Sequence, residues 1–314
     1  MNKIIQFIQK NNRFAITSHA HPDGDAIGSS LALALALETL GKTAHIFHAD
    51  PHPQSYTFLP KIETIQITDL IEDDYDGLFV LECNDLIRPG ISNLDTFCVI
   101  NIDHHPNTNY FGRFNWVDPT AAAVGEMIYD LIKGLSVPLT PEIATNLYVA
   151  IMTDTGSFQF SNTHARTFQI AGKLASSGAN PYTIAQSIYM NQPHAKIRLL
   201  GILLDTLKLP SQDKIATISL TQKMLNETGA NANDLEGIAN YALSVEGVLL
   251  AAFFREESSL RYRISLRSKD HYNIADVAQF FGGGGHPNAA GLTLEGDFEE
   301  ISKKVIAELD KLLH

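Results

Sequence analysis

The chain has 314 residues, of which 45% are hydrophobic and 18% charged, and its formal net charge is −12 at pH 7. This length allows two domains with separate cores, and the near-average composition argues against a disordered or repeat protein. The negative charge excludes a broad cationic groove for long nucleic acid, because Lys and Arg supply most of that affinity. No apolar run reaches membrane length and no signal peptide opens the chain, so we expect a cytoplasmic protein with no membrane contact.

The first 191 residues alternate strand-like and helix-like segments, which is typical of a parallel sheet. Short apolar runs predict strands at residues 14–17, 44–48, 77–81 and 98–102. Segments rich in helix formers, several opened by Thr or Pro, predict helices at 26–40, 121–134, 141–153, 164–177 and 181–190. We therefore predict that residues 1–191 form an α/β domain whose parallel sheet has helices on both faces.

The remaining residues are organised differently. A helix is predicted at 193–209, and the sequence Pro-Ser-Gln-Asp at 210–213 ends it. Strands at 215–220, 248–255 and 260–266 follow, together with helices at 233–243, 274–281 and 298–313. We place a helical linker at residues 192–212 and a smaller α/β domain with a mixed sheet at 213–314.

His19, Asp23 and Asp25 lie in one short loop between a predicted strand and the helix that follows it. An imidazole and two carboxylates in a tight turn suit a divalent cation such as Mn²⁺. The ordinary alternative is that Asp25 caps the helix and Asp23 is a turn residue.

A second cluster, Asp103, His104 and His105, directly follows another predicted strand. The carboxyl ends of parallel strands meet at one edge of a sheet, so both clusters could share one site. A polar turn is the alternative, although two histidines behind an aspartate are unusual turn residues. One histidine could bind metal and its neighbour act as an acid or phosphate contact.

Two single carboxylates occupy related positions. Glu82 ends the strand at 77–81, and Asp154 ends the helix at 141–153. Alone, each is more often a cap or a solvated terminus. With the two clusters, they complete two coordination shells.

The run at 282–291 contains four consecutive glycines followed by His286. Consecutive glycines let backbone amides approach a phosphate closely, and the histidine would be a donor. A flexible loop is the alternative. Arg261, Arg263 and Arg267 alternate along a nearby predicted strand, a pattern that an ordinary solvated face would also produce.

These motifs, in this order, resemble the DHH phosphoesterase superfamily with its C-terminal DHH-associated domain. The resemblance is carried by residues 19–25, 81–85, 103–105, 153–158 and 282–291 and so spans nearly the whole chain. Length and domain order are similar to the bifunctional oligoribonuclease and pAp phosphatase (nanoRNase) branch.

The resemblance implies two Mn²⁺ ions, with Mg²⁺ or Co²⁺ as alternatives. The implied ligands are His19 and Asp23 for one ion, Asp25, His104 and Asp154 for the other, and Glu82 as the bridge. The family more usually has aspartate where this chain has Glu82, which is longer by one methylene. The implied catalytic residues are His105 and Asp103, and the implied substrate-binding residues are Arg267, Ser268, Gly284, Gly285, His286 and Asn288.

The implied activity is hydrolysis of di- to penta-ribonucleotides to mononucleotides and dephosphorylation of 3′-phosphoadenosine 5′-phosphate (pAp). Phe158 and Phe160 could stack on bases, although Phe more often packs in a core. The alternatives are a phosphodiesterase for linear or cyclic dinucleotides and a non-catalytic nucleotide-binding module. A pyrophosphatase ranks last, because the second half of the chain does not match that family. A homodimer is left open.

Overall fold

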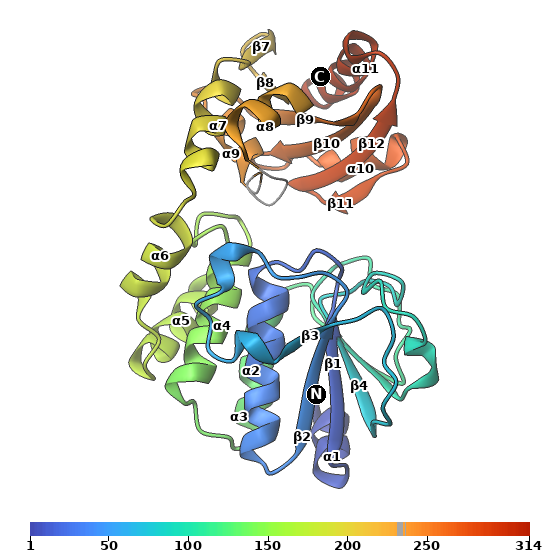
Figure 1. The fold of residues 1–314 in the computed structure, drawn as a ribbon, viewed down its shortest axis with the longest axis vertical. Helices are drawn as coiled ribbons and strands as arrows, with labels where there is room; N and C mark the ends of the chain where they lie inside the picture. Colours follow the sequence, from blue (N-terminus) through green and yellow to red (C-terminus); the bar gives the residue numbers. More distant parts are fainter. Residues whose placement is uncertain (231–234, 236) are drawn as a thin grey trace. The chain divides into compact units, whose positions relative to one another are not determined.

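The structure is a computed structural model that describes residues 1–230, 235 and 237–314. The chain forms two compact units, residues 1–191 and 192–314 (Figure 1). Within the described residues, no helix combines the length and the apolar character needed to cross a membrane.

The first unit contains a six-stranded sheet in the order β3-β2-β1-β4-β5-β6, and every pair is parallel, as predicted. Its strands are β1 (Arg13–Ser18), β2 (Thr43–His48), β3 (Ile65–Ile67), β4 (Gly77–Leu81), β5 (Val99–Asp103) and β6 (Phe114–Val117). The edge strands β3 and β6 were not predicted. Both are short and partly exposed, so they lack the continuous apolar run of a central strand.

The two faces of this sheet are packed differently. The helices of the unit are α1 (Asn2–Lys10), α2 (Gly24–Thr39), α3 (Val124–Gly134), α4 (Pro141–Asp154), α5 (Ala165–Ser176) and α6 (Pro181–Tyr189), and their apolar side chains share one core with one face. On the other face, Ile71, Cys83, Ile91 and Leu94 come from irregular segments and the 3-10 turn η3 (Leu94–Thr96). The prediction of helices on both faces is therefore wrong in this detail, because residues such as Pro89 and Gly90 interrupt helix formation there.

Helices α2 and α4 approach each other closely because α2 carries glycine at positions one turn apart. A Cβ at Gly28 would lie 2.4 Å from the Asn146 carbonyl oxygen, and a Cβ at Gly24 would lie 2.4 Å from Thr153 Oγ1. Only a residue without a side chain fits either position. This close packing brings the C-terminal end of α4 beside the N-terminal end of α2.

The second unit contains a six-stranded sheet in the order β11-β12-β10-β9-β8-β7. Strands β8 (Ile215–Leu220) and β9 (Leu250–Ser258) pair in parallel, and the other pairs are antiparallel, so the predicted mixed sheet is confirmed. The other elements are β7 (Lys208–Ser211), β10 (Arg261–Ser268), β11 (Gly284–His286), β12 (Ala289–Glu295), α7 (His194–Leu204), α8 (Gln222–Thr228), α9 (Ile238–Leu243), α10 (Ile274–Phe280) and α11 (Phe298–Asp310).

Two predicted segments of this unit differ from the structure. The helix predicted at 193–209 ends at Leu204, and Pro210 lies in the edge strand β7, where its missing N–H breaks no interior ladder. The helix predicted at 233–243 begins at Ile238, and residues 233, 234 and 236 lie outside the described residues. Gly284 and Gly285 of the glycine run lie in the paired strand β11, so the alternative of a flexible loop does not hold for them.

Candidate metal centre

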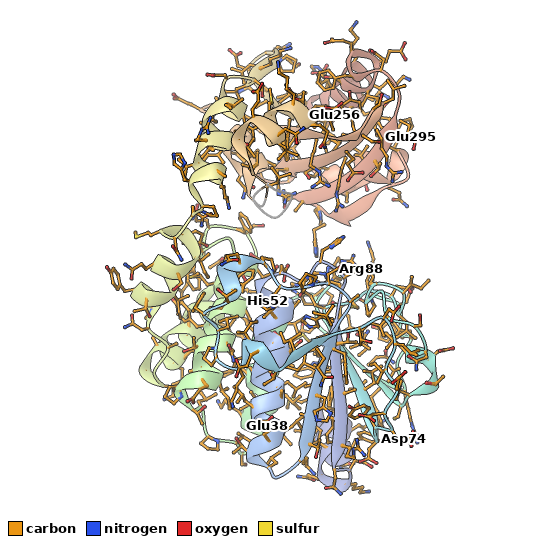
Figure 2. All side chains as sticks on the ribbon, in the orientation of Figure 1. Glu38, His52, Asp74, Arg88, Glu256 and Glu295 are labelled. Carbon is orange, nitrogen blue, oxygen red and sulfur yellow. The ribbon has the colours of Figure 1, made fainter. Side chains whose placement is uncertain are left out.

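The candidate centre lies where the strand order of the parallel sheet reverses. Residues after β1, β4 and β5 contribute to it, and the order changes direction between β1 and β4. Figure 2 shows Arg88 and His52, which follow β4 and β2, at one end of the unit, and Glu38 and Asp74, which precede those strands, at the other. In open α/β sheets, ligands bind outside the carboxyl ends of the strands at such a reversal.

The first ligand cluster consists of His19, Asp23 and Glu82, whose candidate ligand atoms all lie within 4.8 Å of one another. His19 Nε2 is 3.5 Å from Glu82 Oε2 and 3.9 Å from Asp23 Oδ1. His19 Nδ1 is 2.8 Å from the carbonyl oxygen of Ala20, which accepts its proton. This contact assigns the tautomer and directs the Nε2 lone pair at the carboxylates, as in metal-binding histidines.

The second ligand cluster consists of Asp25, His104 and Asp154 and meets the same distance limit. His104 Nε2 is 3.5 Å from Asp154 Oδ2, and His104 Nδ1 lies 3.0 Å from the carbonyl oxygen of Ala121. Both histidines are therefore oriented in the same way, by a backbone carbonyl behind the ring.

Asp25 is held at the N-terminal end of α3. Its carboxylate accepts hydrogen bonds from the backbone N–H groups of Val124 (2.6 Å) and Gly125 (2.9 Å) and from the Ser29 hydroxyl (2.9 Å). Burial nevertheless raises the pKa of Asp25 to about 6, and the attraction of His104 and these donors limits the rise. A helix N-terminus stabilises an anion in this position.

Asp23 has two roles. Its Oδ1 accepts hydrogen bonds from the backbone N–H groups of Asp25 and Ala26, both at 3.0 Å, so Asp23 is the N-cap of α2. The ordinary alternative placed the cap at Asp25, which is two residues too late. Capping does not remove Asp23 from the first cluster, because a carboxylate can accept several bonds.

The two clusters interact electrostatically. Burial, followed by the charges of Asp23, Asp25 and Asp154, raises the pKa of Glu82 well above its usual value. Burial also raises the pKa of Asp154 to about 8, against the attraction of His104. Among the described residues, none donates a hydrogen bond to the buried Glu82 Oε2. Buried, mutually repelling carboxylates beside two imidazoles form a donor set that fits divalent cations.

Behind the second cluster, Asp103 orients His105. Asp103 is fully buried, and its Oδ1 is 2.7 Å from His105 Nδ1 and accepts the His104 backbone N–H at 2.9 Å. Burial favours its neutral form, but the hydrogen bonds from His105 and Thr108 outweigh this and lower the pKa of Asp103.

Sequence reasoning missed two hydroxyl groups that contact these carboxylates. The Thr108 hydroxyl approaches Asp103 Oδ2, and the Ser29 hydroxyl donates to Asp25. A hydroxyl near a functional carboxylate is too common in sequences to be a signal.

The predicted substrate-binding residues all belong to the second unit: they lie at the end of β10, in β11, and in the turn between β11 and β12, the strand that pairs with both. Arg267 is half-buried, and its Nη1 donates to the Leu266 carbonyl oxygen at 2.9 Å. Asn288 Nδ2 donates to Ser268 Oγ at 2.9 Å, and that hydroxyl donates to the Tyr272 carbonyl oxygen at 2.6 Å. Ser268 and Asn288 therefore hold the local loop. Gly284 and Gly285 lie in β11 beside His286, and a Cβ at Gly285 would lie 2.5 Å from the Ala289 carbonyl oxygen.

A parallel sheet with mixed carboxylate and imidazole clusters at its reversal point is an architecture of metal-dependent hydrolases. The model of the DHH family, N-terminal domain, matches residues 13–151, and the model of the DHHA1 domain matches residues 212–311. The chain belongs to the DHH family, so the resemblance stated from its motifs is confirmed.

Three known proteins are similar to this chain over most of its length. The bifunctional oligoribonuclease and PAP phosphatase NrnA of Thermus thermophilus is 36% identical, over 93% of this chain and 87% of that protein. A solved exopolyphosphatase-related protein from Bacteroides fragilis is 27% identical, covers 100% of this chain and 97% of its own, and superposes with a TM-score of 0.91. RecJ of Thermus thermophilus, solved with Mn²⁺, is 14% identical with a TM-score of 0.54, covers 98% of this chain and 54% of its own, and shares the fold.

Proposed function

We propose that the chain is a metal-dependent phosphoesterase that hydrolyses short oligoribonucleotides to mononucleotides and dephosphorylates pAp. The observation that carries the proposal is the meeting of six ligand-type side chains, from distant parts of the sequence, in two adjoining clusters. Membership of the DHH family and the activity named for the Thermus thermophilus relative support this substrate class. The net charge of −12 also favours short substrates over long nucleic acid.

The centre would hold two divalent cations, with Mn²⁺ as our first choice and Mg²⁺ or Co²⁺ as alternatives. His19 and Asp23 would hold one ion, Asp25, His104 and Asp154 the other, and Glu82 would bridge them. When bound, such ions lower the pKa of a coordinated water and polarise phosphoryl oxygens.

The remaining residues of the centre orient groups and move protons. Asp103 holds the Nδ1 side of His105, so His105 would present Nε2 to the phosphoester. In that position His105 would stabilise the phosphoryl oxygens or protonate the leaving oxygen. The N-terminal end of α3 keeps the Asp25 carboxylate oriented throughout.

We assign catalysis to residues 1–191 and substrate binding to residues 213–314. Arg267 supports this assignment, because burial lowers the pKa of its guanidinium and, among the described residues, none forms an ion pair with it. A half-buried cation of this kind would pair with a substrate phosphate, next to Gly284, Gly285 and His286.

The test is hydrolysis of pAp and of end-labelled di- to penta-ribonucleotides by the full chain with Mn²⁺, and again with Mg²⁺. We expect wild type to release phosphate and mononucleotides, and we expect His104→Ala to lower turnover by more than about a hundredfold. His194→Ala, an exposed histidine on α7, is the matched control and should retain wild-type turnover. Circular dichroism checks that each variant is folded.

The outcomes separate the proposal from its alternatives. Turnover of linear or cyclic dinucleotides without turnover of pAp would make the chain a dinucleotide phosphodiesterase. Binding of pAp with no phosphate release under any of these metals would make it a nucleotide-binding module. Full activity of His104→Ala would remove the assigned centre.

A further inference from the structure

The two phenylalanines after Asp154 have different environments. Phe158 is partly buried, and its ring packs against Tyr148 (centroids 6.1 Å apart) and stacks on Phe168 (5.3 Å, interplanar angle 27°). Phe160 is 47% exposed, and among the described residues it has no ring partner. Core packing therefore explains Phe158 and leaves Phe160 without a structural role.

The backbone that leads from the end of α4 to Phe158 is strained. Gly156, Ser157 and Phe158 are consecutive residues with positive φ, at +54°, +61° and +65°. Residues other than glycine visit this region singly and at a cost, so three in a row require compensation from their surroundings. The hydrogen bonds that hold this turn include Ser157 N–H to the Met152 carbonyl oxygen (2.7 Å) and Phe160 N–H to the Thr155 carbonyl oxygen (3.0 Å).

The strained turn places the Phe160 ring against the backbone of Gly156. A Cβ at Gly156 would lie 2.4 to 2.6 Å from three atoms of that ring, so the ring occupies the space of a side chain. Gly156 is two residues from Asp154, which belongs to the second ligand cluster. The turn is tied to this end of α4 by Asn162, whose Nδ2 donates to the Asp154 carbonyl oxygen at 3.2 Å. An exposed aromatic ring is thus held against the turn that directly follows Asp154.

We propose that Phe160 is the stacking platform for the nucleobase of the nucleotide whose phosphate lies at the metal centre. This inference rests on the proposed phosphoesterase function and deepens it. Every nucleobase has a flat π-face, so stacking on one ring holds a substrate without selecting its sequence. Backbone strain is common at functional turns, which is consistent with this role. A stacked base would also cover the exposed face of the ring.

The experiment compares two substrates with the same phosphates, pAp and the base-free analogue 1-deoxyribose 3,5-bisphosphate, with Mn²⁺ and the full chain. We expect Phe160→Ala to raise KM for pAp about tenfold, the size of a lost stacking contact, and to leave kcat/KM for the base-free analogue unchanged. Phe160→Trp should keep the wild-type KM for pAp. Phe160→Leu, which keeps apolar volume without a flat ring, should behave like Phe160→Ala.

Phe168→Ala is the matched control, because Phe168 is 57% exposed in the same unit but already stacks on Phe158. It should not change the KM for pAp. Binding of adenosine 5′-monophosphate by calorimetry gives a readout without turnover, and it should weaken in Phe160→Ala but not in Phe168→Ala.

An unchanged KM in Phe160→Ala, or a wild-type KM in Phe160→Leu, would overturn the stacking role while hydrolysis by wild type still upheld the proposed function. Loss of activity on both substrates in Phe160→Ala would mean that the residue supports the centre itself, which also overturns the role. If wild type hydrolyses neither substrate, the proposed function fails and this inference fails with it.

Discussion

Glu82 is held in an unfavourable state in two respects. Its φ of +56° lies in the left-handed region, which Asn and Asp adopt more readily than Glu. Its side chain is also buried among three other carboxylates, which together with burial raise its pKa. A residue kept in such a state is a candidate for function rather than stability.

Glu82→Gln should therefore stabilise the metal-free protein. A carboxyl with a raised folded pKa contributes full stability below its unfolded pKa and loses that contribution as the pH rises through its folded pKa. The advantage of the variant, measured in EDTA, should thus be small near pH 4 and grow toward pH 8, where we expect about 1 to 3 kcal/mol. Thermal unfolding at several pH values measures it.

Added Mn²⁺ should reverse the order of stability, because the ion binds the wild-type carboxylate and not the amide. Glu72→Gln, at an exposed position, is the control and should follow wild type in both conditions. A Glu82→Gln variant that is less stable than wild type without metal, or that gains as much from Mn²⁺, would contradict the assigned bridging position.

At the scale of elements, the contact between α2 and α4 places two carboxylates of the second cluster beside each other. Asp25 is in the first turn of α2 and Asp154 is the last residue of α4. The glycines at positions 24 and 28 permit this contact because no Cβ fits against α4. The geometry of the candidate centre therefore depends on helix packing as well as on the side chains that form it.

Gly28→Ala should push α4 away from α2. We expect a loss of about 1 to 3 kcal/mol in the free energy of unfolding, typical of overpacking, and a weaker affinity for Mn²⁺ because Asp25 and Asp154 move apart. Denaturant unfolding and metal titration measure the two effects. Gly172→Ala is the control, because a Cβ at Gly172 in α5 meets nothing within 4 Å. Equal effects of the two substitutions would mean that the α2–α4 contact does not align the cluster.

At the scale of the whole molecule, we propose separate roles for the two compact units: the first binds metal and the second binds substrate. Arg267→Gln should raise KM for pAp about tenfold or more, through loss of a charge-assisted contact. The stabilisation by Mn²⁺ should be unchanged, because the candidate ligands all lie in the first unit. Arg263→Gln, on the same strand but exposed, should match wild type in KM. A loss of Mn²⁺ stabilisation in Arg267→Gln would contradict these separate roles of the two units.

The sequence by itself determined the fold class, the parallel sheet, the mixed second sheet and the family, because apolar periodicity and motif order are local properties of the chain. It did not predict the edge strands β3 and β6, the end of α7 at Leu204, or the irregular cover on one sheet face. These features depend on pairing and packing partners that are distant in sequence.

Only the tertiary structure decided which predicted site residues meet. It brought His19 beside Glu82 and Asp25 beside Asp154, and it separated the buried Phe158 from the exposed Phe160. It also identified the groups that hold these side chains, such as the N-terminal end of α3 behind Asp25. The physical reason is that hydrogen bonds and burial act through space, whereas a motif records only spacing along the chain.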